Sequence, residues 1–435
     1  MININWQSRS FYVASVKEMD AGRRLARILI LTEIFRPCPQ APSQRVSSFA
    51  KSLSLSGCRV SVIAANRCFR EKLGSPIYDG LQVYNLRCPR AILSLSSLML
   101  DPFITLLFLL FSVVVGLKDG IDAILVSVPN GDVGVAGFFA SKLLAVPLLV
   151  DMRDLYPPSS STLPYLHASI SEGLNKLLTV FFSFIYRNIE KISCVDSSIK
   201  KKLENLGICS ASVVVIPNGA DLSIYKPCFT SRKREKIRQN YRLPLDKLII
   251  VYAGSLARYY PLRTVIEGLK AMSSDRDNIQ FLVVALRGHR DLETFVRRLG
   301  LKDAVKFMGP LRVEEASTVL SACDVGVVVY RAESVWKGTF GSKIFSYMAC
   351  GLPILASGPR GSVIGQLISQ NNVGVFVGEP TQSNFARQFS FVLNNREEIK
   401  KMGENARRLV ERSYDRKRIS LRLASVMESM VSRDG

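Results

Sequence analysis

The sequence predicts an α/β protein with two doubly wound domains, each built on a mostly parallel sheet. Short apolar runs with strand character recur along the chain, with helical segments between them. Several runs are almost continuously apolar, which is typical of parallel strands covered on both faces. One charged stretch without strand character, SRKREKIRQNYRLP (231–244), interrupts the alternation before a fresh apolar run begins. The alternation predicts the fold class, and the interruption predicts two sheets.

The strand candidates follow in chain order, and each ends in a segment that can form a loop and a helix. Because parallel strands need a crossover between them, we expect a helix in most of the intervals. In the first half we expect strands at 27–33, 59–65, 81–87, 122–128, 147–153, 191–196 and 213–219. In the second half we expect strands at 247–254, 279–285, 304–309, 324–330, 352–357 and 373–378.

The charged stretch also sets the expected domain limits, with a hinge near 220–245. Residues 1–25 lack the apolar core of a signal peptide and are expected to form an extension. In such sheets ligands bind at the carboxyl ends of the strands, so two facing domains would form a cleft there. The expected parts are an extension at 1–25, a first domain at 26–225, a linker at 226–245, a second domain at 246–410 and a final helix at 411–435.

Composition limits the classes of partner and of metal site that the chain is expected to have. The chain of 435 residues has a net charge of +22, which favours an anionic partner such as a nucleotide or a membrane surface, although a basic soluble surface is the simpler alternative. Nucleic acid is disfavoured, because the basic residues are spread out and no series of stacking aromatic residues accompanies them. The nine cysteines include no CxxC pair, which fits reduced thiols in the cytoplasm. Only two histidines occur, which argues against a histidine-rich zinc site.

One apolar run, FITLLFLLFSVVVGL from Phe103 to Leu117, resembles a membrane segment. As a helix it would rise about 22 Å, which is short of a hydrocarbon core of roughly 30 Å. We therefore expect a helix that is buried or touches a membrane without spanning it. A second apolar helix, starting near Leu174, could lie beside it.

The stretch GSKIFSYMACGLPILA (341–356) predicts a short helix between two buried strands. Ser342 can cap the helix start and Gly351 can end it. Lys343 in the first turn could balance a diphosphate at the helix N-terminus, and glycines at 338 and 341 would let a ligand approach the backbone. The alternative is a tightly packed connection between two strands.

Three other strand ends carry candidate groups. Gly254 and Arg258 follow one strand and could bind phosphate, or they could form an ordinary turn. Asp151, Arg153 and Asp154 crowd another strand end, which indicates either a structural Asp–Arg pair or a catalytic role. Arg45 would lie in the first turn of a helix, which suits a cation only if it binds an anion; a solvated arginine is the alternative.

Five stretches in this order resemble the GT-B glycosyltransferases of family 4 (group 1), a retaining family that includes bacterial cell-surface sugar transferases. The resemblance runs from Ala26 to Leu421, and VDMRDLYP is similar to the signature of the N-acetylfucosamine and O-antigen-type subgroup. It implies a GT-B fold with two Rossmann-like domains. The stretches are the Pro-rich loop around Arg45, VDMRDLYP, VVVIPNGADLSIYKP, YAGSLARYYPLRTVIEGL and GSKIFSYMACGLPILAS.

The resemblance implies a nucleotide diphosphate sugar as donor, with a UDP-sugar favoured, and no cofactor or metal. It further implies a leaving phosphate that takes the acceptor proton, so that stabilising the leaving charge dominates catalysis. The implied donor-binding residues are Gly254, Ser255, Arg258, Glu333, Gly338, Gly341, Ser342, Lys343 and Ile344. On the acceptor side they are Arg45, Asp151 and Asn218, and the implied catalytic residues are Arg153, Asp154, Arg258 and Lys343.

The chain departs from the family pattern at the donor site. The usual pair of glutamates is replaced by Gly338 and Ser346, and the usual lysine of the donor loop by Tyr260. Glu333 could substitute for a missing carboxylate. We expect an enzyme, peripheral to the inner face of the cytoplasmic membrane, that extends a lipid-linked saccharide for O-antigen, capsule or exopolysaccharide. A non-catalytic scaffold protein of the same pathway and a nucleotide-sugar epimerase are the alternatives.

Overall fold

The structure, a computed structural model, describes residues 25–432 except for several internal gaps. Contacts between residues divide the chain into two compact units. Unit 1 contains residues up to 194, 200–215 and 420 onward, and unit 2 contains 195–199 and 216–419. The gaps are 37, 39, 66–76, 79, 87–101, 129–130, 155–167, 229, 257–259, 273, 286–288, 334–336 and 339–340.

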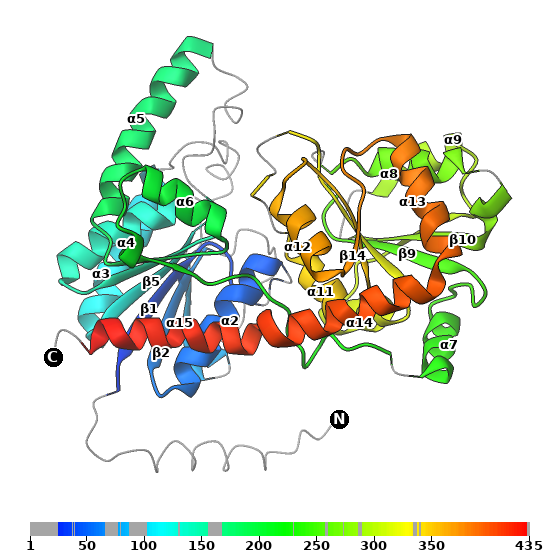
Figure 1. Ribbon diagram of the computed structural model, residues 1–435. Helices are drawn as coiled ribbons and strands as arrows, with labels where there is room; N and C mark the ends of the chain where they lie inside the picture. Colours follow the sequence, from blue (N-terminus) through cyan, green and yellow to red (C-terminus); the bar gives the residue numbers. More distant parts are fainter. Residues whose placement is uncertain are drawn as a thin grey trace, which may run out of the picture. The chain divides into compact units, whose positions relative to one another are not determined.

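Unit 1 is built on a sheet of eight strands in the order β3-β4-β2-β1-β5-β6-β7-β8 (Figure 1). The pairs are parallel except for β3 with β4. The chain adds β2 and β4 on one side of β1, and then β5 to β8 on the other, so the direction of winding reverses between β1 and β5. The strands are β1 (Arg27–Thr32), β2 (Arg59–Ala64), β3 (Ile77–Tyr78), β4 (Leu81–Asn85), β5 (Ala123–Val128), β6 (Leu148–Met152), β7 (Lys191–Cys194) and β8 (Val213–Val215).

Helices cover this sheet. α3 and α4 pack against each other and against β1, while α2 packs on β2 and β4. The final helix, α15, carries the chain from unit 2 back into unit 1. The helices of this half of the chain, with α15, are α2 (Ala41–Leu55), α3 (Pro102–Asp119), α4 (Gly131–Leu144), α5 (Ala168–Arg187), α6 (Ser197–Asn205) and α15 (Arg416–Val431), with a 3-10 turn, η4, at Ser210–Ser212.

Unit 2 is built on a parallel sheet of six strands in the order β11-β10-β9-β12-β13-β14 (Figure 1). Every residue of β10 and of β12 is buried, as expected for strands covered on both faces. Here the winding reverses between β9 and β12. The strands are β9 (Leu248–Ala253), β10 (Ile279–Val284), β11 (Val305–Met308), β12 (Val325–Val329), β13 (Ile354–Ser357) and β14 (Gly374–Phe376).

The helices of unit 2 complete the alternation, and α8 and α13 pack against each other. In chain order they are α7 (Ser231–Asn240), α8 (Leu262–Ala271), α9 (His289–Arg298), α10 (Val313–Ser321), α11 (Lys343–Ala349), α12 (Val363–Asn371), α13 (Gln382–Asn394) and α14 (Arg396–Ser413), with a 3-10 turn, η5, at Ser274–Asn278.

The predicted fold class is confirmed, and each of the thirteen expected strands is present. β3 was not predicted, because two residues are too short to form an apolar run. The stretch expected to be a linker at 226–245 contains α7, and the contact-based boundary falls at 215–216. The expected domain limits themselves stay a prediction.

α7 is held in unit 2 by ion pairs that could not be predicted from the sequence. Arg238 is buried, and its Nη2 donates to Asp324 Oδ2 at 2.7 Å. Asp324 also pairs with Arg234 and accepts from the backbone N–H of Ile249 at 2.7 Å. The charged stretch is thus tied to the starts of β9 and β12, which explains why it forms a helix of the domain.

The apolar run at 103–117 lies within α3, which is three residues longer than expected. Among the described residues, one helix is long enough and apolar enough to cross a membrane, judged by length and composition alone, and that helix is α3. The buried core helix of a soluble protein can have the same length and composition. α5 carries exposed Leu177, Val180 and Phe184. That α5 lies beside α3 stays a prediction.

Candidate functional site

The helix α11 follows the winding reversal of unit 2, where ligands bind in sheets of this kind. Its start differs from the expectation, because Ser342 takes the cap position but its side chain makes no cap hydrogen bond. Its end is as predicted, with Gly351 in the left-handed conformation at φ 75°. The hydroxyl of Tyr347 accepts from the backbone N–H of Ala253 at 2.6 Å, which ties α11 to the carboxyl end of β9.

Lys343 lies in an aromatic cage at this strand end. Its ammonium nitrogen is 4.1 Å from the ring centroid of Tyr252 and 4.0 Å from that of Tyr260. The same nitrogen donates to the Tyr252 hydroxyl at 2.9 Å, and that hydroxyl donates to the Ser255 carbonyl at 2.5 Å. Among the described residues, Lys343 has no carboxylate within ion-pair distance. The aromatic faces of the two tyrosines therefore hold the Lys343 ammonium, and no described carboxylate balances its charge.

The burial of this amine has an electrostatic consequence. Desolvation lowers the pKa of Lys343 to about 7, from an ordinary value of 10.5. A lysine whose charge is this costly in its surroundings gains most from a bound anion, because an opposite charge nearby favours the ammonium form. The arrangement is suited to a phosphate or diphosphate group.

Two glycines shape the space around the cage. Gly254 has φ 148°, and a Cβ there would lie 3.2 Å from the Lys343 nitrogen. A Cβ at Gly341 would lie 2.3 Å from the hydroxyl of Tyr330, a side chain that is fully buried. The ring of Tyr330 is 5.8 Å from that of Tyr260. Both glycines thus permit packing around the cage that a side chain would prevent.

The remaining predicted donor-binding residues differ in burial and in their contacts. Ser255 is exposed in the loop after β9, and Ile344 is buried in the core behind α11. Gly338 is half-buried in a turn. Glu333 is exposed and makes a long 3.8 Å pair with Arg331, so no described contact joins it to Lys343. Arg258 lies outside the described residues.

In unit 1 two of the predicted acceptor-side residues, Arg45 and Asp151, form a buried cluster. Arg45 reaches Asp151 from α2 with two hydrogen bonds, from Nε at 2.9 Å and from Nη2 at 2.7 Å. Ser193 on the neighbouring strand donates to Asp151 at 2.8 Å. Arg45 also lies over the ring of Phe49, with 4.7 Å from Cζ to the centroid. Of the two alternatives for Asp151, the structural Asp–Arg pair is present, with Arg45 as the partner.

The ionisation of Asp151 follows from these contacts. Burial by itself raises the pKa of the carboxyl, but the charge and hydrogen bonds of Arg45 outweigh it, with help from Ser193 and Arg153, and the pKa is lowered. Asp151 is therefore a carboxylate whose bonds are used within the fold.

Arg153 is the other cation of this cluster. It follows β6 and is partly buried, and its buried Nε has no hydrogen-bond partner among the described residues. Burial lowers the pKa of the guanidinium, and the nearby Arg45 acts in the same direction while Asp151 opposes both. Asp154 is exposed. Asn218 is half-buried in the loop after β8 and belongs by its contacts to unit 2.

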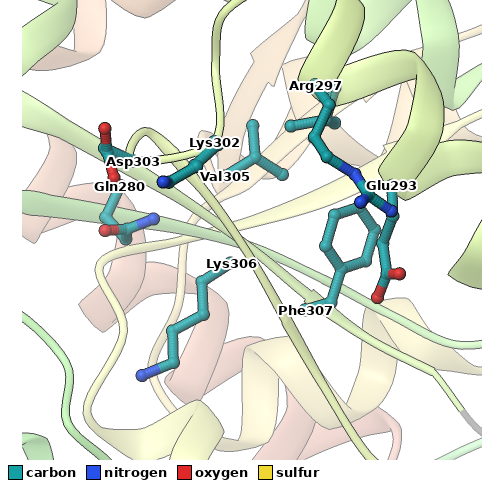
Figure 2. A pocket seen from close by; sticks show the side chains of 9 residues that line it. Gln280, Glu293, Arg297, Lys302, Asp303, Val305, Lys306 and Phe307 are labelled. Atoms are coloured by element: carbon teal, nitrogen blue, oxygen red, sulfur yellow. The ribbon is translucent and has the colours of Figure 1, made fainter.

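Unit 2 also has a hollow of about 570 Å³, and Figure 2 shows the side chains that line it. Gln280 lies near the start of β10 and Asp303 precedes β11, so the hollow opens at the amino ends of these strands. The Lys343 cage lies at the carboxyl ends. Lys306, one of the side chains that line the hollow, donates hydrogen bonds to the backbone carbonyls of Tyr241 at 3.0 Å and Arg242 at 2.6 Å. The hollow is therefore separate from the candidate site.

Sequence reasoning did not foresee the roles of Tyr252 and Tyr330. Both are tyrosines at the ends of otherwise aliphatic strands, which was the available signal. Tyr260 was noted only as the replacement of a lysine, whereas the structure places its ring against the ammonium of Lys343.

Comparison with known proteins gives a consistent result for both halves of the chain. Residues 233–409 match the family model described as "Glycosyl transferases group 1", and residues 41–219 match "Glycosyl transferase 4-like domain". A D-inositol 3-phosphate glycosyltransferase of Geodermatophilus obscurus is 27% identical over 211 residues, which is 46% of this chain and 44% of that protein. The alignment thus spans less than half of that relative. The putative glycosyltransferase YtcC of Bacillus subtilis is 22% identical over 298 residues, covering 66% of this chain and 71% of that protein.

Solved structures agree on the fold. A sucrose-phosphate synthase from Thermosynechococcus elongatus superposes with a TM-score of 0.75 at 17% identity, covering 94% of this chain and 100% of that one. The Anabaena protein HepE superposes with a TM-score of 0.67 at 18% identity, covering 93% and 100%. Two doubly wound sheets in this order, with both halves matched, are the GT-B architecture. The second half of the chain thus matches the group 1 glycosyltransferase model, and the first half matches the glycosyltransferase 4-like domain model.

Proposed function

We propose that the protein is a retaining, metal-independent glycosyltransferase that moves a sugar from a UDP-sugar to a lipid-linked saccharide. It would work at the inner face of the cytoplasmic membrane, in the synthesis of a cell-surface polysaccharide such as O-antigen, capsule or exopolysaccharide. The observation that carries the proposal is the caged Lys343, a half-buried cation without a described carboxylate partner at the winding reversal of unit 2.

On the donor side, Lys343 would bind the diphosphate and stabilise the charge that develops on it as the glycosidic bond breaks. Gly254 would let the diphosphate approach the backbone, and Arg258 could add a second cation. The choice of UDP is supported by HepE, whose crystal structures were solved with UDP, with UDP-glucose, and with UDP and glucose. HepE is at most 18% identical to this chain, so its ligand is a guide to the experiment.

On the acceptor side, Arg153 is the suited group, because Arg45 is already occupied by Asp151. A guanidinium with a buried, unbonded Nε matches an anionic acceptor such as a lipid-linked diphosphate. Asp154, exposed beside it, could orient an acceptor hydroxyl. One solved structure guides the choice of a cell-surface saccharide. WaaG, with a TM-score of 0.69 at 14% identity, is described as a glycosyltransferase involved in lipopolysaccharide biosynthesis.

A non-catalytic role in the same pathway is the second candidate, and the observation that favours it is Ser346. This residue takes the place of a family glutamate and lies beside Tyr225, a buried side chain of the domain core. A position used for packing leaves one fewer group for the sugar. Transfer activity separates the two candidates, since a scaffold protein could still bind a nucleotide.

The test is transfer of label from radioactive UDP-sugars to lipid. Purified protein is mixed with bacterial membrane lipids that carry undecaprenyl-linked saccharides, and label in the organic extract is counted. We expect incorporation from one UDP-sugar, loss of it in Lys343→Ala, and no change in Lys400→Ala, which removes an exposed lysine on α14. UDP binding without transfer from any donor would support the scaffold. Turnover of a UDP-sugar without an acceptor would point to an epimerase.

A further inference from the structure

The helix α3 presents an apolar face to solvent. Six of its large apolar side chains are between 43% and 74% exposed, which is unusual for a helix packed on a sheet. Their spacing places them along one side of the helix. The six are Phe103, Leu106, Leu110, Phe111, Val114 and Leu117.

The neighbouring helix α4 extends this face. α3 and α4 lie side by side on unit 1 (Figure 1). They cross closely at Gly116, where a Cβ would lie 2.3 Å from Leu144 Cδ1. Next to that crossing α4 exposes Leu143, and one turn earlier it exposes Phe139. These two residues and the six on α3 are called the α3–α4 face.

The opposite side of α3 rules out a membrane span. Ile104, Phe108 and Val115 are at most 3% exposed, because they pack in the core of unit 1. Pulling α3 into a bilayer would uncover that core. A helix with one side in the core and one side bare can only lie along a surface.

The chemistry of the α3–α4 face fits lipid better than protein. From Pro102 to Leu117 α3 has no charged residue. Its Ser112 hydroxyl is buried and bonded to the Phe108 carbonyl at 2.5 Å, so it offers nothing to a partner. Protein interfaces carry hydrogen bonds at a density that this face cannot supply. Exposed Lys118 lies at the end of α3, while Lys142 at the end of α4 already pairs with Glu190 at 3.1 Å. The net charge of +22 suits an anionic surface.

We propose that the α3–α4 face inserts into the headgroup region of an anionic bilayer and holds unit 1 on the membrane. Such insertion buries an apolar helix face about 5–10 Å into the boundary between headgroups and acyl chains. The proposal deepens the proposed function, because it names the surface through which the enzyme would meet a lipid-linked acceptor. The two can fail separately, since UDP binding depends on unit 2 and vesicle binding on this face.

The experiment is flotation of the full chain with vesicles of equimolar phosphatidylglycerol and phosphatidylcholine. The test variant is Leu106→Glu/Leu110→Glu, at positions that are 50% and 53% exposed. The control is Leu55→Glu/Leu245→Glu, at positions outside the face that are 52% and 49% exposed. We expect wild type and control to float, and the partition coefficient of the test variant to fall on the order of 30-fold.

Two further measurements keep the test decisive. UDP binding by the test variant, measured by calorimetry, should equal that of wild type and shows that the chain is folded. Leu110→Trp needs no added charge, and its fluorescence should be quenched by brominated lipids beyond the quenching seen in wild type. Flotation of the test variant equal to wild type would overturn the proposal. A wild-type dimer that does not float, and that becomes monomeric in the test variant by light scattering, would assign the face to a second copy of the chain instead.

Discussion

The caged lysine makes donor binding dependent on pH in a way that can be worked out from the structure. Lys343 must be charged to hold a diphosphate, but burial lowers its pKa to about 7 in the free protein. Above that pH the free amine is mostly neutral, so binding of UDP must draw a proton from solution. Arginine at this position would stay charged, so Lys343→Arg is the matched perturbation.

The size of the effect follows from the fraction of charged amine. At about pH 7 half of the amines are charged, and at about pH 9 roughly 1% are, so the UDP affinity of wild type should fall about 50-fold between them. That change corresponds to ~2.3 kcal/mol of binding free energy. The second ionisation of a phosphate group lies near pH 6, so the ligand's own charge is nearly constant over this range.

The assay is isothermal titration of UDP at several pH values from neutral upward, in two buffers with different enthalpies of ionisation. In wild type the difference in heat between the buffers should report uptake of close to one proton per UDP at the alkaline end. Lys343→Arg should show a flat profile and no proton uptake, even if its geometry weakens binding overall.

Two results would refute the reasoning. A wild-type affinity that is constant across this pH range would mean that the amine is not buried as the structure places it. The same pH profile in wild type and in Lys343→Arg would mean that another group titrates.

Three other perturbations test the packing around the two clusters. Lys343→Met should raise the free energy of unfolding by ~1–3 kcal/mol at neutral pH, because it removes a half-buried, desolvated cation that has no ion pair among the described residues. The lysine penalty is complete below its folded pKa of about 7 and fades as the pH rises toward 10.5, so urea titrations should show the gain shrinking over that window. Arg45→Ala should cost about 3–5 kcal/mol in urea unfolding, since it leaves the Asp151 carboxylate buried and unpaired, and an equal loss in Arg45→Ala/Asp151→Ala would contradict this. Gly341→Ala should lower the melting temperature and weaken UDP binding, because its Cβ would meet a buried tyrosine hydroxyl at 2.3 Å, whereas Gly173→Ala, inside α5 with open space around it, should raise the melting temperature slightly and leave UDP binding unchanged.

The sheets could be predicted from the sequence because their signal is local. Runs such as those of β10 and β12 are almost entirely apolar, and the alternation with helices follows from the crossovers that parallel strands require. β3 could not be found in this way, since it is two residues long and exists only by pairing with β4. The helix α7 in the charged stretch at 231–244 could not be predicted from local sequence either, because it is held by a hydrogen bond from Arg238 to Asp324, 86 positions away.

The sequence indicated which strand ends carry candidate residues, but it did not indicate which side chains contact one another there. Gly254, Gly341 and Lys343 were recognised because glycine and lysine at strand ends have a direct chemical meaning. The cage was not, because the contact of Lys343 with Tyr252 joins residues 91 positions apart. The pairing of Arg45 with Asp151 joins residues 106 positions apart, and nothing in either local sequence indicates it. Side-chain partners across a sheet depend on the strand order, which alternation alone does not give.

The central claim is that Lys343 is the cation of a nucleotide-diphosphate site, and calorimetric titration with UDP at about pH 7 tests it most directly. Wild type and the exposed-lysine control Lys400→Ala should bind UDP with the same affinity. Lys343→Ala should bind it on the order of 100-fold more weakly, since a hydrogen bond to a charged group contributes up to about 3 kcal/mol. Wild-type protein that binds no nucleotide diphosphate, or a Lys343→Ala variant that binds UDP as tightly as wild type, would contradict the claim.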